Sequence, residues 1–280
     1  MSKHRLTWTQ ERFEQLVKDG RGQGRGQDYK PWLTIHDFPS EGRSTRSPGW
    51  KTNRIHHFLS DQEIRYFYLV EWSDLVIDVR EQYPLLDIGL ATQIAHDMGI
   101  RYPTDSVSGA PYVLTTDFML TLEENGRSVE VAHTIKHSKK LDEKRVVEKL
   151  ELERRYWATK EVEWGIVTEK EIPLVLARNI EWLYSAYRME PTKDVSLPEM
   201  LSISSILKKR LLLSVTPISK VTTELDKEMN LEIGTCLYIF KHLVARKKIV
   251  LDMHSKINVC HSAKTIQKII LDDNNMGALA

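Results

Sequence analysis

The clearest hydrophobic pattern in the chain is a pair of strand-like runs over residues 113–122 and 129–136. They flank the polar segment E-E-N-G-R, in which Asn125-Gly126 is the dipeptide most typical of a tight β-hairpin turn. The first run carries one acid, Asp117, and the second ends in one cation, Lys136. If the two strands pair, this carboxylate and this amine lie side by side at the end of a sheet.

Apolar residues at helical spacing predict helices on both sides of the hairpin. Thr9 and Ser60 can cap helices that begin just after them, and Glu63 stands at the capping-box position relative to Ser60. Short β-type runs occupy residues 75–80 and 164–168. This order of strands and helices predicts an α/β core with a mixed sheet. The expected helices cover residues 8–18, 60–72, 93–101 and 141–160.

The second part of the chain has a mainly helical pattern, and prolines mark a boundary between residues 168 and 198. A series of helix, turn, helix and small hairpin resembles a winged helix, which binds DNA or another protein. We therefore expect two domains, residues 1–170 and 171–280. The elements expected in the second are helices at 197–213, 217–229 and 235–247, and strands at 247–253 and 256–260.

Charge and cysteine content exclude little. The 280 residues include 40 basic and 39 acidic side chains, so only local patches can favour a nucleic acid. Two cysteines without metal-ligand spacing fit a reducing cytoplasm. No stretch approaches the ~20 apolar residues that a membrane span needs. We expect a cytoplasmic protein without a membrane segment.

The first 57 residues form a basic, turn-rich arm. Its run G-R-G-Q-G-R-G lacks the G-K-[ST] ending of a phosphate loop, which favours a flexible basic loop. Further along, cations are interleaved with Trp50 and with hydroxyl residues. A solvated loop and a DNA-contacting arm both explain this pattern, because phosphate contacts need charge and reach. These cations are Arg43, Arg46, Lys51 and Arg54.

Two positions near the hairpin have alternative interpretations. Asp117 is costly in an apolar strand unless it is paired or binds a metal. A structural ion pair with Lys136 and a metal-assisted phosphodiester-cleaving site therefore both remain open. Glu63 either caps its helix or points into the same site.

Three further acids lie on the helix that follows the hairpin. Basic residues on the same helix favour solvated ion pairs for these acids, because pairs one turn apart are common. Glu153 is the first choice among them for a contact to a metal. The acids are Glu148, Glu151 and Glu153, and their expected partners are Lys149, Arg154 and Arg155.

An acid on one strand and a motif ending in x-x-K on the next resemble the restriction-endonuclease-like PD-(D/E)xK nucleases. The segments H-H-F-L-S-D-Q-E, T-T-D-F, E-K-L-E-L-E-R-R-Y-W, N-I-E-W-L-Y-S and G-R-G-Q-G-x-G-x-D-Y narrow the resemblance to the TnsA family. Members of that family are endonuclease subunits of heteromeric cut-and-paste bacterial transposons. The matching segments run from residue 20 to residue 185. The implied fold is a catalytic core over 58–170, followed by a mainly helical, winged-helix-like domain.

The resemblance also implies a catalytic set of Glu63, Asp117 and Lys136. It further implies that the two carboxylates and the backbone carbonyl of Ile135 hold Mg²⁺, for which Mn²⁺ substitutes, because these are hard oxygen ligands. The family pattern has Gln two residues before the lysine, where this chain has Thr134. A Thr hydroxyl has a shorter reach than an amide, and it can either hydrogen-bond a metal-bound water or ligate the metal weakly.

The activity implied by the resemblance is cleavage of the 5′ ends of a transposon, on the strands that are not transferred. The implied partners are transposon-end DNA, a TnsB-like DDE transposase, and a TnsC-like AAA+ ATPase that contacts the C-terminal region. Two other functions fit the same pattern. One is a non-catalytic DNA-binding scaffold subunit, and the other is a stand-alone restriction-type nuclease that cuts without partners.

Overall fold

A computed structural model describes residues 7–37, 43–192 and 194–271. The basic arm therefore lies partly outside the described residues. The chain divides into two compact units, Met1–Ile172 and Pro173–Ala280. No helix of the described residues is long and apolar enough to cross a membrane.

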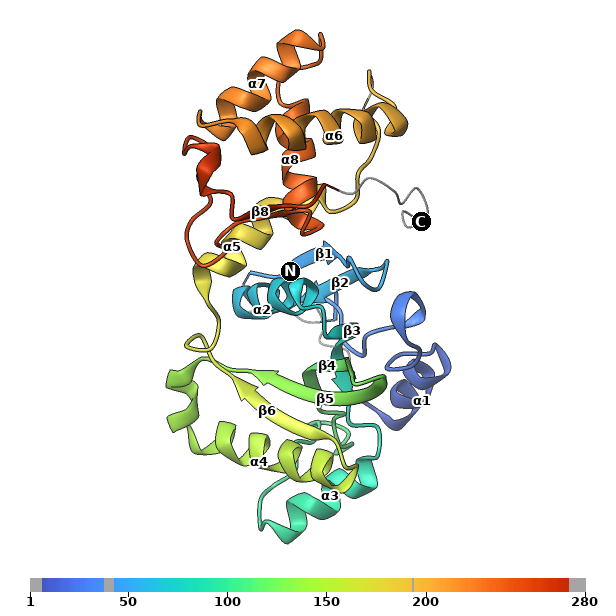
Figure 1. Cartoon of the computed structure of the whole chain (residues 1–280). Helices are drawn as coiled ribbons and strands as arrows, with labels where there is room; N and C mark the ends of the chain where they lie inside the picture. Colours follow the sequence, from blue (N-terminus) through green and yellow to red (C-terminus); the bar gives the residue numbers. More distant parts are fainter. Residues whose placement is uncertain (1–6, 38–42, 193, 272–280) are drawn as a thin grey trace. The chain divides into compact units, whose positions relative to one another are not determined.

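The first unit is built on a four-stranded mixed sheet with the order β3-β4-β5-β6 (Figure 1). The first three strands are antiparallel, whereas β5 and β6 are parallel, which requires the crossover helix α4 between them. The mixed α/β core expected from the pattern is confirmed. The strands are Val76–Pro84 (β3), Thr115–Glu124 (β4), Arg127–Ile135 (β5) and Glu163–Val167 (β6), and α4 is Lys144–Thr159.

The turn between β4 and β5 is formed by Asn125 and Gly126, as predicted. Both residues have positive φ, 52° and 74°, as a turn that matches the right-handed strand twist requires. The hairpin ladder runs from the pair Glu124–Arg127 to the pair Phe118–His133. Asp117 lies just beyond the last of these pairs.

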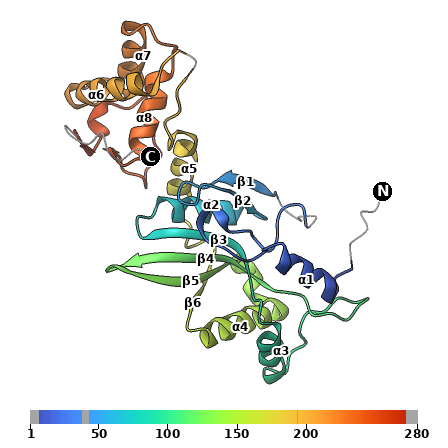
Figure 2. The same cartoon turned by 90° about the vertical axis from the view of Figure 1, so that its right-hand side faces the viewer.

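Helices cover both faces of the sheet (Figures 1 and 2). On one face, α4 and α3 (Ile88–Asp97) pack in an apolar core that includes Met119 and Ala132 of the hairpin. The helix α3 begins earlier than expected, because Asp87 accepts the backbone N–H of Leu90 and caps it. On the other face lies α2 (Asp61–Trp72), which Ser60 caps as predicted.

The described residues 7–37 and 43–58, called the N-terminal segment below, are folded onto the core and do not form a free loop. After α1 (Gln10–Lys18), the glycine run ends in the short helix η1 (Gly26–Asp28). A Cβ on Gly22 would lie 2.3 Å from the ring of Pro84, so a glycine is needed for this close approach. The expectation of a flexible loop at this run is therefore wrong. Strands β1 (Thr45–Pro48) and β2 (Ile55–Phe58) then form a small antiparallel sheet.

The second unit is mainly helical. Helix α7 (Ile218–Glu228) and helix α8 (Thr235–Ala245) are joined by a turn that includes Gly234 at a φ of 107°. The unit also contains α5 (Leu174–Leu183), η3 (Tyr184–Ala186), α6 (Leu197–Leu213) and η4 (Ala263–Thr265). Its likeness to a winged helix stays a prediction.

One strand of the second unit was expected in the wrong place. Strand β7 (Ile249–Val250) pairs with β8 (Lys268–Ile269) and not with residues 256–260. The amide of Asn179 explains the difference, since it donates to the carbonyls of Met253 and Ser255 at 2.9 and 2.8 Å and accepts the N–H of Ile257 at 3.1 Å. These bonds hold the start of the expected strand and the residues before it against α5 as a loop.

Candidate active site

The candidate site lies where the β4–β5 hairpin opens. The carboxylate of Asp117 accepts the backbone N–H of Ile135 at 2.7 Å, in the place of a strand-to-strand hydrogen bond. The Nζ of Lys136 is 3.5 Å from the same Oδ2 atom. The structure thus brings Asp117 and Lys136 together, and the nearby carboxylate raises the pKa of the lysine.

The sequence left open whether Glu63 caps its helix or points into the site, and the structure shows that it does both. Its backbone N–H donates to the hydroxyl of Ser60 at 3.2 Å, so Ser60 caps the helix, and its carboxylate accepts the N–H of Leu59 at 2.9 Å and the hydroxyl of Ser60 at 2.8 Å. It is also buried, with 7% of its surface exposed. Burial, together with the negative charge of Asp117, raises the pKa of Glu63 to about 7. The cap therefore holds this carboxylate at the edge of the site.

Glu153 is the fourth ionisable group of the site, and the solvated ion pair that its spacing favoured is wrong for it. Its Oε1 accepts hydrogen bonds from the hydroxyl of Thr116 at 2.6 Å, from the indole N–H of Trp164 at 3.1 Å, and from the hydroxyl of Thr134. Burial among these neutral donors raises the pKa of Glu153 to about 7.

The other two acids of α4 remain solvated, as expected. Glu151 binds Arg154 and Arg155, each at 2.7 Å. Glu148 pairs at 3.0 Å with Arg145 and not with the expected lysine. The three acids lie on different sides of the same helix. Among them, Glu153 is on the side that faces the sheet.

Thr134 was expected to ligate a metal weakly or to hydrogen-bond a metal-bound water. In the structure its hydroxyl donates to Glu153, so its proton is already used within the protein. This contact makes Thr134 a residue that positions Glu153. Whether its oxygen also reaches a metal stays a prediction, as does the role of the Ile135 carbonyl.

The charge of the site favours a cation. The site has three largely buried carboxylates, those of Glu63, Asp117 and Glu153. The amine of Lys136 offsets only part of their negative charge. Among the residues that the structure describes, no three acidic, histidine or cysteine side chains converge closely enough to form a metal cluster. The donors are nevertheless hard oxygens with excess negative charge, which is the ligand chemistry that Mg²⁺ and Mn²⁺ prefer.

Sequence reasoning missed Gln82 of β3. Its Oε1 accepts the hydroxyl of Thr115 at 3.1 Å, and its Nε2 lies 3.5 Å from Glu63 Oε2. It is 3% exposed and has a φ of +48°. The available signal was a polar residue inside a strand, which is weak without knowledge of the backbone conformation.

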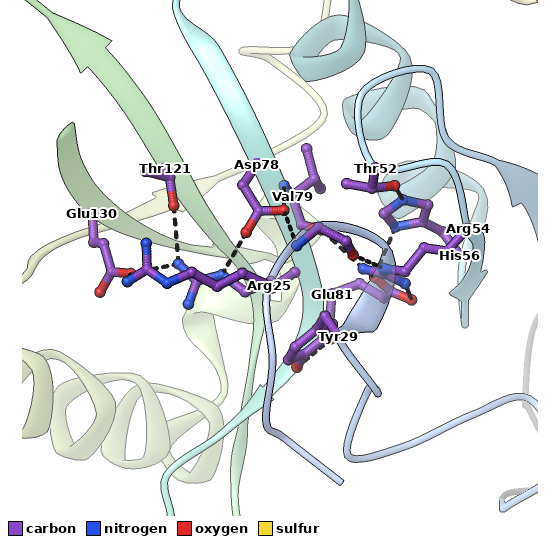
Figure 3. Close-up of polar contacts among 12 residues, drawn as sticks. Arg25, Tyr29, Thr52, Arg54, His56, Asp78, Val79, Glu81, Thr121 and Glu130 are labelled. Atoms are coloured by element: carbon purple, nitrogen blue, oxygen red, sulfur yellow. Dashed lines mark hydrogen bonds and ion pairs between the residues drawn. The ribbon is translucent and has the colours of Figure 1, made fainter. Parts of the chain in front are cut away.

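A second buried acid, Glu81 of the same strand, lies in a different environment (Figure 3). Arg54 donates to its two carboxylate oxygens at 2.8 and 2.5 Å, and the ring of His56 lies 2.8 Å from Oε2. The guanidinium side chain of Arg54 is only 8% exposed. Arg54 is thus a buried ion-pair partner, so a solvated position is wrong for this residue, whereas DNA contact by the arm stays a prediction.

Comparisons with known proteins match nearly the whole chain. A family model described as "TnsA-like endonuclease N terminal" matches residues 73–169, and one described as "TnsA endonuclease C terminal" matches residues 171–253. Among curated proteins, the "Transposon Tn7 transposition protein TnsA" of Escherichia coli is 38% identical over 262 residues, 93% of each chain. Asp117 and Lys136 fall inside the first match, whereas Glu63 precedes it.

Proposed function

This chain belongs to the TnsA endonuclease family, and on that premise we propose that it cleaves the 5′ ends of a transposon. The cut strands are those that are not transferred during cut-and-paste transposition. The observation that carries this proposal is the placement of Lys136 3.5 Å from Asp117, with Glu63 close enough for its pKa to be affected by the charges of both.

The proposed cofactor is Mg²⁺, for which Mn²⁺ can substitute. The carboxylates of Glu63 and Asp117 and the carbonyl of Ile135 would hold it, with Glu153 as the candidate for a further contact. When bound, a divalent ion supplies Lewis-acid polarisation of the scissile phosphate and an activated water. A bound cation would also favour the charged forms of Glu63 and Glu153, whose pKa values are raised to about 7 by burial and, to a smaller extent, by the charge of Asp117.

The residues of the chain have separate roles in this proposal. Asp117 accepts the Ile135 N–H and so has one oxygen fixed relative to the end of β5. Lys136 carries a positive charge that the neighbouring carboxylate stabilises. This ammonium would orient the attacking water and offset charge that develops on the phosphate. Thr134 and Thr116 hold Glu153 in place.

The proposed machine has several components. We assign the endonuclease to residues 1–170 and a winged-helix-like contact module to residues 171–280. Transposon-end DNA is the substrate, a TnsB-like transposase cuts and joins the 3′ ends, and a TnsC-like ATPase contacts the C-terminal region. The protein would work in the bacterial cytoplasm, at the nucleoid when it is bound to DNA.

The test is strand cleavage of labelled transposon-end DNA with Mg²⁺ and the partner transposase. We expect Asp117→Ala to abolish 5′-end cleavage, whereas Asp97→Ala, at an exposed acid of α3, leaves it unchanged. Undiminished cleavage by Asp117→Ala would exclude this site. Robust cutting by the wild-type chain alone would instead favour a stand-alone nuclease. Cleavage by neither the chain alone nor the assembled complex would favour a scaffold subunit.

A further inference from the structure

We propose that Gln82 is a positioning residue of the candidate site, which orients the Glu63 carboxylate through its side-chain amide. This inference rests on the proposed function, because it gives Gln82 a part in the same metal-dependent reaction. It starts from a conformation that a glutamine rarely adopts. Gln82 has a φ of +48° in the interior of β3, a region that is unfavourable for residues with a Cβ.

Gln82, with its left-handed backbone conformation, lies at the same level of the sheet as the candidate site. The strand pairs Glu81–Phe118 and Tyr83–Thr116 stand on either side of it. Gln82 therefore lies beside Asp117 on the neighbouring strand. A strained backbone conformation at such a place is more often part of a functional site than an accident of folding.

Both ends of the side-chain amide are engaged. Its Oε1 accepts the hydroxyl of Thr115 at 3.1 Å, and its Nε2 lies 3.5 Å from Glu63 Oε2, at the long limit of a hydrogen bond. An ionised carboxylate only accepts hydrogen bonds, so the NH₂ end of the amide faces Glu63 when that acid is charged, as it would be when it holds a metal. The Thr115 hydroxyl then donates to the other end of the amide and holds the side chain in place.

The surrounding structure holds Gln82 in this conformation. Its backbone carbonyl accepts the N–H of Trp32 at 3.2 Å, and Trp32 is itself buried. The preceding carbonyl, that of Glu81, accepts the hydroxyl of Tyr29 at 3.0 Å. The N-terminal segment therefore fixes the strand on both sides of the strained peptide. These two hydrogen bonds stabilise an unfavourable backbone conformation, and that conformation places the Gln82 amide beside Glu63.

Two substitutions distinguish the effect of the side-chain amide from the effects of backbone strain and of side-chain packing. Gln82→Met keeps the length and volume of the side chain but removes its hydrogen bonds. Gln82→Gly also removes the amide, but it relieves the left-handed strain. If the amide positions Glu63, both variants weaken Mn²⁺ binding, as expected when the hydrogen-bond partner of a metal ligand is lost. If only packing matters, Gln82→Met binds Mn²⁺ like the wild type.

The measurements are calorimetric titration of the full chain with Mn²⁺ and thermal unfolding without metal. We expect roughly 10- to 100-fold weaker Mn²⁺ binding for both variants, with a similar loss of 5′-end cleavage in the assembled complex. The matched control is Glu161→Gly, at an exposed residue with a φ of +57°. It relieves the same kind of strain and should leave Mn²⁺ binding unchanged.

Each outcome decides the inference. Wild-type Mn²⁺ affinity in Gln82→Met overturns it, as does a loss of folding in Gln82→Met while the control stays folded. If the wild-type chain itself shows no Mn²⁺ binding that depends on Asp117, the proposed metal site fails and this inference fails with it. Weaker binding by both variants at unchanged stability supports it.

Discussion

Two sets of buried carboxylates in the first unit behave in opposite ways. Burial alone would raise the pKa of Glu81, but its hydrogen bonds and electrostatic contacts with His56 and Arg54 outweigh burial and hold the pKa well below its ordinary value. Glu153 is also buried, and its three hydrogen-bond donors are neutral. Burial therefore dominates there and raises the pKa of Glu153 to about 7.

The difference shows how a structural acid can be distinguished from a functional one. Glu81 is charged because cations compensate it within the protein, and its network connects β3 to the N-terminal segment (Figure 3). Glu63 and Glu153 lack this compensation. At Glu63, burial and the charge of Asp117 outweigh the charge of Lys136, and at Glu153 burial outweighs the neutral donors. Buried carboxylates that the protein leaves undercompensated are candidates for binding an external cation.

The strongest test of the structural side is Glu81→Gln. Loss of its charge leaves the buried cation Arg54 without a counter-charge, which typically costs about 3–5 kcal/mol of unfolding free energy. Because the pKa of Glu81 is lowered on folding, its contribution exists above the ordinary carboxyl pKa and is lost as the pH falls. Urea unfolding at pH 7 measures the effect. The surface variant Glu151→Gln should cost less than ~1 kcal/mol, and equal losses would refute the comparison.

The strongest test of the functional side is Lys136→Met. Removing a charge that stabilises the transition state should slow 5′-end cleavage roughly 100- to 1,000-fold. The control is Lys160→Met, which removes a surface ion pair with Asp87 near the end of α4. Single-turnover rates in the assembled complex measure both variants. If the two rates are equal, the Asp117–Lys136 contact is only a structural ion pair.

The next effect concerns the pH dependence of stability. The pKa of Glu153 is raised on folding, so the folded protein binds more protons than the unfolded one between the ordinary carboxyl pKa and about 7. Metal-free stability should fall as the pH rises through this interval. Glu153→Gln removes the charge while its Oε1 can still accept the three donors. We expect it to stabilise the chelator-treated protein at pH 8, on the order of 1–3 kcal/mol, but not at pH 5.

A matched variant on the same helix tests this assignment. Glu148 is solvent-accessible and paired with Arg145, so Glu148→Gln should change stability little at either pH. Thermal unfolding in EDTA at both pH values compares the two. If Glu153→Gln gives the same stability change at pH 5 and pH 8, the acid is already compensated and the contrast with Glu81 disappears.

Features of the fold and of the site could be predicted when they depend on residues close in the sequence, and not when they depend on contacts between distant segments. Asn125-Gly126 fixed the hairpin locally, and the hairpin brought Asp117 to Lys136. The burial of Glu153 could not be predicted, because the helical spacing of the three acids does not show which side meets the sheet. The left-handed Gln82 and the buried ion pair of Arg54 depend on contacts between the N-terminal segment and β3, which no local pattern reveals.

The smallest expected effect comes from Thr134→Val, which removes one of the neutral hydrogen-bond donors of Glu153. It tests whether these donors only position Glu153, in contrast to the charged partner of Glu81. Loss of one hydrogen bond should cost about 1 kcal/mol of metal-free stability. If Thr134 only positions Glu153, Mn²⁺ binding measured by calorimetry changes less than tenfold, because Thr116 and Trp164 still hold the carboxylate. Thr222→Val, at a buried threonine of the second unit, is the control for loss of a hydroxyl. A greater than 100-fold loss of Mn²⁺ affinity in Thr134→Val alone would show that its hydroxyl ligates the metal directly.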